Sequence, residues 1–447
     1  MIRTLVFALM IIGAFYAGFI SPFGALLAYI WFGLFRPAEW VWIDISQFRL
    51  SLILGIILIV RCISSGNWPN LSHRLSIGIM VFLGTGLVAH FNAIKPDLSW
   101  HWLDYFARLS LVSLLLVSLI NSQKRFVYTI IVISSSLGFY TLKAGIIALL
   151  SGGTKFADGL AGAFIDNNAY AIVCVMIIPL LLAVADNFPT AWHLSKIISL
   201  GYRCAAVLTS FVVVSTFSRS GFLALTSAVI IYIIFHQQRS KIFGVMISIG
   251  IFVILFVPIP EGYIDRLQTI TTYNEIGEES AISRIHFWHV AWNMALDNPF
   301  GVGMHSFNAA YDRYDFLFGR YGHSRSVHNS HLQTLAENGF LGFSVWIWLF
   351  FSSLNTCLNI RRFAKNQLAG TSDGRFFETM AGALVVSMVA FVVGGSFIAM
   401  ALNDVTWLTF GLVASLDRLS IKAKEAQRTL CLTKAGISST TITSSYY

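Results

Sequence analysis

Long apolar runs recur from one end of the chain to the other, and they limit the folds that it can adopt. A membrane-crossing helix needs ~20 apolar residues, and the alternation typical of a transmembrane barrel is missing. Of the 447 residues, 56% are hydrophobic and only 11% are charged. The sequence therefore predicts an all-α, polytopic transmembrane protein with roughly 12 spans. The clearest runs are Leu5–Ile20, Ile77–Phe91, Leu109–Ile120, Phe126–Leu150, Ala169–Val184, Phe222–Phe235, Val245–Val257, Phe340–Leu354 and Met380–Leu402.

The net charge of +9 is explained by its placement. Basic residues gather in alternate connections, which the positive-inside rule assigns to the cytoplasm. No soluble domain is visible that would carry a nucleic-acid-binding face, so no nucleic-acid partner is expected. The cytoplasmic groups are Lys124-Arg125, Arg239 to Lys241, Arg361 to Arg375 and Arg418 to Lys434. Ser151–Asn168, Thr216–Gly221 and Pro258–His331 then face outward, while the side of the N-terminus stays open.

These features divide the chain into four regions. Residues 1–198 form an N-terminal transmembrane region, and residues 199–360 form a core that includes the outward loop 258–331. Residues 361–418 form a transmembrane hairpin, and residues 419–447 form a basic, then Ser/Thr-rich, cytoplasmic tail that we expect to be disordered. The five cysteines are scattered without metal-type spacing, so neither a metal site nor a disulfide framework is expected.

The loop 258–331 is predicted to be a sizeable extramembrane segment with interfacial helices. It contains five arginines, no lysine and six of the 11 histidines, a composition that suits anion recognition. Within it, Ser283–Leu296 is predicted to form an amphipathic helix on the membrane, capped by Ser280 or Ser283 and ended by Asn298-Pro299. Arg284, Trp288 and Trp292 share one face of this helix.

His328 is the first candidate for catalysis. Asn329 or Ser330 can cap the short helix that follows, so His328 stands just ahead of a helix N-terminus. The positive end of the helix dipole disfavours the imidazolium and leaves a neutral ring that can accept a proton. His331, in the same turn, is a secondary candidate.

Three further positions accompany it, and each has a structural alternative. Arg219 lies between apolar segments, where an arginine costs ~2.5 kcal/mol or more at depth unless it has an anion or water beside it, or snorkels to headgroups. Arg284 can bind an anion or stack on a tryptophan. Asp166, with Asn167, can orient an acceptor or a sugar, although capping of the following helix is the simpler role for Asp166.

Together these residues suit a phosphate-bearing lipid whose head group is transferred. Two arginines would hold a diphosphate and offset the charge that grows on it, and the neutral histidine would take the proton of an attacking hydroxyl.

Several motifs resemble those of the O-antigen ligase and polymerase superfamily. Thr216–Gly221 is similar to its Ser-Arg-x-Gly element, and Arg284 stands in a Ser-Arg-Ile-x-x-Trp context. His328-Asn329, followed after nine residues by Gly339-x-x-Gly342, resembles the ligase signature. The N-terminal half resembles the O-glycosylation ligases associated with exosortase A systems, although Asn329 replaces the small residue expected in that branch. The cues for the branch are Pro22-Phe23-Gly24, Arg36-Pro37 with Trp40, Phe164 to Asn168 and Glu261 to Tyr273.

The resemblance implies a metal-independent, inverting glycosyltransferase of the bacterial inner membrane, without a cofactor and with its active site facing the periplasm. It would move a glycan from undecaprenyl diphosphate to a hydroxyl on lipid A-core, protein or saccharide. Arg219 and Arg284 would hold the diphosphate, and His328 would act as the base.

An O-antigen or exopolysaccharide polymerase is the closest alternative, since only the acceptor differs. A lipid or polysaccharide transporter is a more distant one, because the candidates cluster at the outer face and acidic residues are scarce at mid-span.

Overall fold

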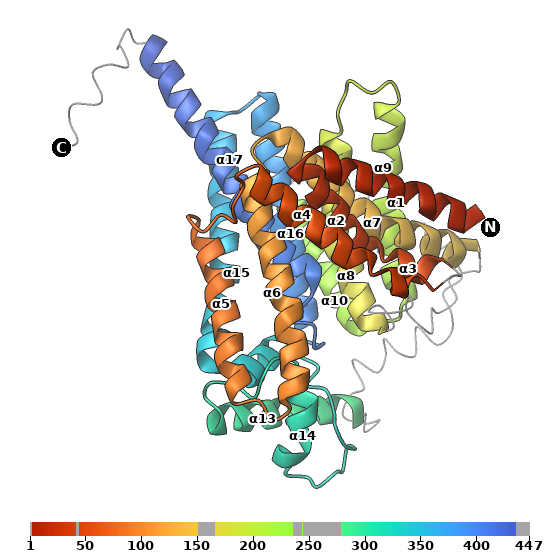
Figure 1. Ribbon diagram of the computed structural model, residues 1–447, viewed down its shortest axis with the longest axis vertical. Coiled ribbons are helices and arrows are strands. Elements are labelled where there is room, and N and C mark those ends of the chain that lie inside the picture. Colours follow the sequence, from red (N-terminus) through yellow and green to blue (C-terminus); the bar gives the residue numbers. More distant parts are fainter. Residues whose placement is uncertain (1, 42–43, 151–165, 236–243, 245–278, 435–447) are drawn as a thin grey trace, which may run out of the picture.

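The protein is built from helices throughout the part that the computed structural model describes, which comprises residues 2–41, 44–150, 166–235, 244 and 279–434 (Figure 1). No strand occurs within these ranges. The helices are α1 (Ile2–Ile20), α2 (Pro22–Phe35), α3 (Pro37–Trp40), α4 (Leu50–Ser64), α5 (Arg74–Phe91), α6 (Pro96–Leu119), α7 (Gln123–Leu150), α8 (Asn167–Asn187), α9 (Ser195–Ser215), α10 (Arg219–Phe235), α13 (Glu279–Asp297), α14 (Phe307–Tyr314), α15 (Ser330–Gln367), α16 (Ser372–Gly395) and α17 (Asp404–Lys434), with a 3-10 turn at Ser46–Phe48.

Eight of the described helices are long and apolar enough to cross a membrane: α1, α5, α6, α7, α8, α9, α15 and α16. Three shorter ones, α2, α4 and α10, are also apolar. These helices confirm the prediction of an all-α membrane protein. The total of roughly 12 spans stays a prediction, because Val245–Val257 lies outside the described residues.

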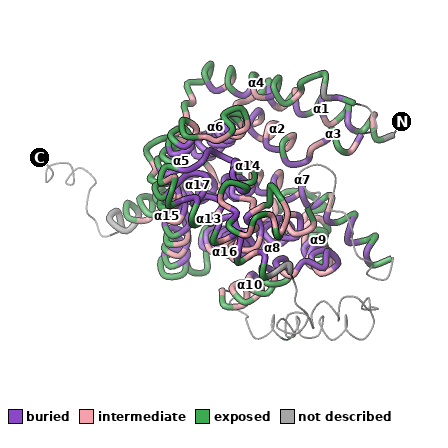
Figure 2. The backbone as a smooth tube through the Cα atoms, turned by 90° about the horizontal axis from the view of Figure 1, so that it is seen from below, coloured by how far each residue is buried: buried purple, intermediate pink, exposed green. Residues whose placement is uncertain are grey.

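The bundle packs around large aromatic side chains. Trp407 of α17 contacts Phe82 of α5 and Phe106 of α6, with ring centroids 4.8 and 4.5 Å apart, and Trp346 of α15 packs against the same group. Figure 2 shows the buried residues concentrated in the middle of the bundle, while α1 and α4 lie at its edge with much of their surface exposed.

A second core lies outside the bundle. It joins α13, α14 and the first turns of α15 at one end of the molecule, opposite the end from which the last turns of α17 project (Figure 1). Phe287, Met294, Phe307 and Tyr311 are fully buried in this core, together with Val327 just before α15. The segment from α13 to the first turns of α15 is therefore a packed unit that can fix the geometry of a site.

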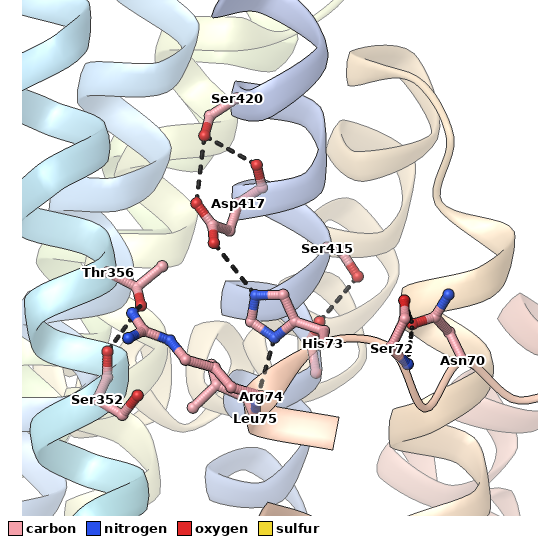
Figure 3. A network of polar contacts seen from close by, with 11 residues as sticks. Asn70, Ser72, His73, Arg74, Leu75, Ser352, Thr356, Ser415, Asp417 and Ser420 are labelled. Atoms are coloured by element: carbon pink, nitrogen blue, oxygen red, sulfur yellow. Dashed lines mark hydrogen bonds and ion pairs between the residues drawn. The ribbon is translucent and has the colours of Figure 1, made fainter. Parts of the chain in front are cut away.

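Polar contacts tie helices together at the opposite end (Figure 3). His73 caps α5, because its Nδ1 accepts a hydrogen bond from the N–H of Leu75 at 3.2 Å. The ring proton is then on Nε2, which donates to Asp417 of α17 at 3.1 Å. Arg74 donates to the hydroxyl of Thr356 on α15 at 2.6 Å, so α5, α15 and α17 are linked directly.

The structure corrects three local predictions. The predicted helix Ser283–Leu296 is present as α13 and ends before Pro299, but it begins at Glu279, so neither Ser280 nor Ser283 is at its N-cap. The run Met380–Leu402 is not one continuous helix: α16 ends at Gly395, and the turn that follows is apolar because Ile398, Ala401 and Leu402 are buried in the protein. The basic part of the tail continues α17 to Lys434 rather than being disordered. Predictions on residues 151–165, 258–278 and 435–447 lie outside the described residues.

Candidate functional site

His328 stands directly before the N-terminus of α15, as predicted. The side chain of Asn329 caps this helix by accepting hydrogen bonds from the N–H groups of His331 at 2.9 Å and Leu332 at 3.0 Å. On the other side, Val327 is fully buried in the second core, which joins α13, α14 and α15. His328 itself adopts a left-handed conformation with φ 47°, so the backbone turns sharply between the buried residue and the cap.

Charged groups from three separate segments act on His328. Burial lowers the pKa of the imidazole below its ordinary value of 6.5, and the positive charges of Arg284 and Arg325 lower it further. The carboxylate of Asp166 acts in the opposite direction. The expected neutral ring is therefore supported, with burial as the largest cause and the charge of Arg284 as the next.

Arg284 belongs to α13, whose next turn carries Phe287. The ring of Phe287 lies 6.2 Å from that of His328, and the guanidinium of Arg325 lies over Phe287 at 5.8 Å. Arg284 is partly buried, whereas Trp292 on the same face is exposed and packs edge-on against Phe340. α13 thus brings the guanidinium of Arg284 beside His328 while leaving Arg284 partly exposed.

Asp166 combines two roles. Its carboxylate caps α8 by accepting from the N–H groups of Asn168 at 2.7 Å and Ala169 at 3.1 Å, which confirms the capping prediction. The same carboxylate also acts on His328. Asn167 is the first residue of α8 and is partly buried.

The turn between α9 and α10 is fastened to this helix end. The hydroxyl of Ser218 donates to the side-chain oxygen of Asn168 at 2.7 Å and accepts from the N–H of Gly221 at 3.0 Å. A Cβ at Gly221 would lie 2.6 Å from the Cβ of Ala171, so a glycine is needed where α10 meets α8. Arg219, the first residue of α10, is thereby held next to the Asp166–Asn168 segment.

A buried carboxylate that the sequence did not single out organises the same region. Glu337, on α15, is 3% exposed and accepts from the backbone N–H groups of His305 at 2.9 Å and Phe307 at 3.2 Å. Gln333 donates to the same carboxylate. Glu337 therefore fixes the segment before α14 against α15. In the sequence, the only sign of a role for Glu337 is its position between His328 and Gly339 of the motif.

Gly339 marks a sharp kink in α15. Its φ of 69° and ψ of −174° break the helix, and the N–H of Phe340 donates to the carbonyl of Pro299 at 3.0 Å. A Cβ at Gly339 would lie only 2.2 Å from that carbonyl oxygen. Gly339, the first glycine of the motif that begins at His328, therefore allows the backbone of α15 to cross close to that of Pro299 and Phe300.

His331 has a different environment from His328. Its Nδ1 accepts from the indole of Trp346 at 3.1 Å, and its Nε2 lies 3.1 Å from the carbonyl oxygen of Val392. Both ring nitrogens therefore have partners, Nδ1 within α15 and Nε2 on α16, so the geometry favours a structural role for this residue.

The loop between α14 and α15 is anchored by a buried pair. His286 of α13 and Asp315 contact each other at 2.8 Å. Burial raises the pKa of Asp315, but hydrogen bonds from the N–H groups of Gly319 and Leu317 and from His286 outweigh this effect and hold it below its ordinary value. The anchored loop carries Arg325 to His328.

Within the described ranges, no group of three or more histidine, cysteine, aspartate or glutamate side chains is placed to hold a metal ion.

Comparisons with known families cover most of the chain in two parts. Residues 204–347 match the O-antigen ligase family, and residues 2–188 match a family of unknown function (DUF5935). No curated protein matches the sequence. The first match supports the O-antigen ligase superfamily and, with the apolar helices, a membrane protein of a glycosyl-transferring type. It includes Arg219, Arg284 and His328.

Proposed function

We propose that this protein is a membrane glycan ligase that transfers a glycan from undecaprenyl diphosphate to an acceptor hydroxyl. The observation that carries the proposal is a half-buried His328 with a lowered pKa, beside Arg284 and ahead of the N-terminus of α15. The O-antigen ligase match over the same residues supports the reaction class.

The proposed reaction is a single displacement at the anomeric carbon. The acceptor oxygen forms a bond to this carbon while the bond to the diphosphate oxygen breaks, so the configuration inverts. Neutral His328 takes the hydroxyl proton. Arg284 and Arg219 bind the diphosphate and offset the negative charge that develops on it as the leaving group departs. The proposed step uses no metal or cofactor.

The charge distribution supports a periplasmic site in the inner membrane. His328 lies at the same end as α13 and α14, whereas the connections at the other end of the bundle are basic. Such basic connections are typical of the cytoplasmic side. The basic residues include Lys124 and Arg125 at the start of α7, Lys196 at the start of α9, and Arg361, Arg362 and Lys365 in the last turns of α15.

We also propose the division at residues 1–198, 199–360, 361–418 and 419–447 and membership of the exosortase-associated branch. Both rest on the sequence motifs. The acceptor is proposed as lipid A-core, protein or saccharide.

The direct test uses the full-length protein in nanodiscs with an undecaprenyl-diphosphate-linked glycan. Mass spectrometry should detect the glycan on an added acceptor, and glycoconjugates lost from a deletion strain identify the natural one. Repeated addition to the same glycan would instead indicate a polymerase. Absence of any transfer, with every glycoconjugate retained in the deletion strain, would refute the proposal.

Arg284→Lys should lower transfer by about tenfold or more. Lysine keeps the charge but loses the two-pronged contact with a phosphate, and a hydrogen bond to a charged group contributes about 1.5–3 kcal/mol. Arg313 is exposed on α14, so Arg313→Lys is the matched control and should transfer normally. Normal rates in Arg284→Lys would argue that Arg284 does not contact the diphosphate.

The pH dependence of transfer should follow the charges around His328. The base must be neutral, so activity is present above its pKa and is lost as the pH falls through it, below 6.5. Arg284→Gln removes a positive charge, raises this pKa and should move the acid limb of the rate profile upward. Asp166→Asn keeps the cap of α8 but removes a negative charge, so it should move the limb downward. If the acid limbs of the two variants did not move, or moved in the same direction, His328 would not be the titrating base.

A further inference from the structure

A cavity of about 360 Å³ lies outside the residues matched to the ligase family, apart from the site built around His328. It is formed by α2, α3, α6 and the start of α17. Its walls are largely apolar and include Ile30, Leu34, Leu109, Val112 and Leu408. Tyr29 and Phe32 add aromatic faces. The polar side chains set into these walls include Arg36, Glu39, Tyr105, Arg108 and Asp404.

Four of the polar side chains, Arg36, Glu39, Tyr105 and Asp404, form a connected group. The hydroxyl of Tyr105 donates to the carboxylate of Asp404. The guanidinium of Arg36 lies 3.5 Å from the carboxylate of Glu39 and 4.0 Å from that of Asp404. Arg108 supplies a second positive charge, which is paired with Asp104 on the same helix. Every cation is thus matched by a carboxylate, so no positive charge is left to attract a phosphate, and the carboxylates would repel one.

This combination of groups matches a saccharide. Each sugar hydroxyl both donates and accepts, so it can use carboxylate oxygens and guanidinium N–H groups side by side. The apolar C–H face of a sugar ring can pack against the aromatic walls. Arg36 also holds a left-handed backbone with φ 47°, and such strained conformations cluster at functional sites.

A polar face of α6 leads to the cavity. Asp97, His101, Asp104 and Arg108 are spaced by four, three and four residues and therefore share one face, and all four are exposed. Asp104 and Arg108 form an ion pair. Charged side chains on a helix of membrane-spanning length are costly in lipid, so this face favours contact with water or polar ligands over contact with lipid chains. Arg108 belongs to both the polar face and the cavity.

The turn between α16 and α17 connects the cavity with the His328 region. On one side, the N–H of Met400 donates to Ser330 at 3.0 Å and the N–H of Ala401 to Gln333 at 3.1 Å, in the first turns of α15. Three residues later, Asp404 begins α17 and faces the cavity. A ligand in the cavity is thus one short turn away from the helix that His328 precedes.

We propose that this cavity binds a neutral saccharide and serves as the subsite for an acceptor sugar that lies away from the reacting hydroxyl. The acceptor role rests on the proposed glycan transfer. Saccharide binding does not, so the two can fail separately.

Filling the cavity is the first test. Gly33 lines the cavity and has no atom within 4 Å of an added Cβ, so Gly33→Phe can occupy the space without displacing a neighbour. Gly84 on α5 is equally open but lies elsewhere, and Gly84→Phe is the matched control. The probes are cellobiose, maltotriose and chitotriose, measured by saturation-transfer NMR on the full chain in nanodiscs. Affinity for at least one probe should fall tenfold or more in Gly33→Phe and stay unchanged in Gly84→Phe.

Two further variants separate this subsite from the transfer chemistry. Glu39→Gln keeps the shape of the side chain and should also weaken saccharide binding about tenfold, because a charged acceptor becomes a neutral amide. His328→Ala should bind the probe like the wild type while failing to transfer. In a transfer assay, Gly33→Phe should raise the KM for the acceptor and leave that for the lipid-linked donor unchanged.

Each outcome decides the question. The proposal is overturned if no probe binds in a Gly33-dependent manner, or if Gly33→Phe instead impairs binding of phosphatidylglycerol vesicles. If the wild type transfers glycan but saccharide binding does not depend on Gly33, only the subsite proposal is refuted. If saccharide binding depends on Gly33 but no transfer occurs, the ligase proposal is refuted and the saccharide site remains.

Discussion

His328→Ala should lower the rate of glycan transfer by about 10²–10⁴-fold, the usual contribution of a general base. The variant removes the group that accepts the hydroxyl proton. Arg284 and Arg219 remain, so binding of the lipid-linked donor should be largely retained. The rate is measured on purified protein in nanodiscs, and donor binding is measured separately under conditions without acceptor.

The control for this variant is His289→Ala. His289 lies exposed on α13, so its loss removes a histidine from the same segment without touching the cap of α15. It should transfer at a rate close to that of the wild type. Transfer retained in His328→Ala, or lost equally in both variants, would show that His328 is not the base.

Local contacts were predictable from the sequence. Asn329 and Asp166 were both expected as possible caps, because capping joins a side chain to N–H groups only two or three residues later. The end of α13 was expected for a similar reason, since Pro299 cannot continue a helix. Apolar runs likewise predicted the membrane-spanning class, because helix length and composition are local properties.

Contacts between distant segments were not predictable in this way. Ser218 and Asn168 are 50 residues apart, and Glu337 reaches the N–H of His305 across 32 residues. His331 was a secondary candidate because it stands at the same helix end as His328. Its partner Val392, however, is 61 residues away on another helix. The turn after Gly395 was not predicted because its residues are as apolar as those of a membrane-spanning helix. They are apolar because they are buried inside the bundle.

Gly339→Ala should destabilise the protein by about 2 kcal/mol or more. An alanine in the left-handed region costs about 1–2 kcal/mol, and overpacking adds about 1–3 kcal/mol. The overpacking arises because the new Cβ would meet the carbonyl oxygen of Pro299 at 2.2 Å and the carbonyl carbon of Phe300 at 2.6 Å. Either the crossing of the two backbones opens or the first turns of α15 shift. Thermal unfolding in nanodiscs should show a lower midpoint, and transfer should fall because His328 and its cap begin this helix.

Gly370→Ala separates the two contributions. Gly370 has a φ of 79° but no atom within 4 Å of an added Cβ, so an alanine there bears the backbone cost without the clash. Its unfolding midpoint should fall less than that of Gly339→Ala, and its transfer rate should stay near that of the wild type. If both variants lost the same stability, the close crossing with Pro299 would contribute nothing. The glycine of the motif would then be needed only for its backbone conformation, and the segment before α14 would be held to α15 by Glu337 and the other hydrogen bonds between them.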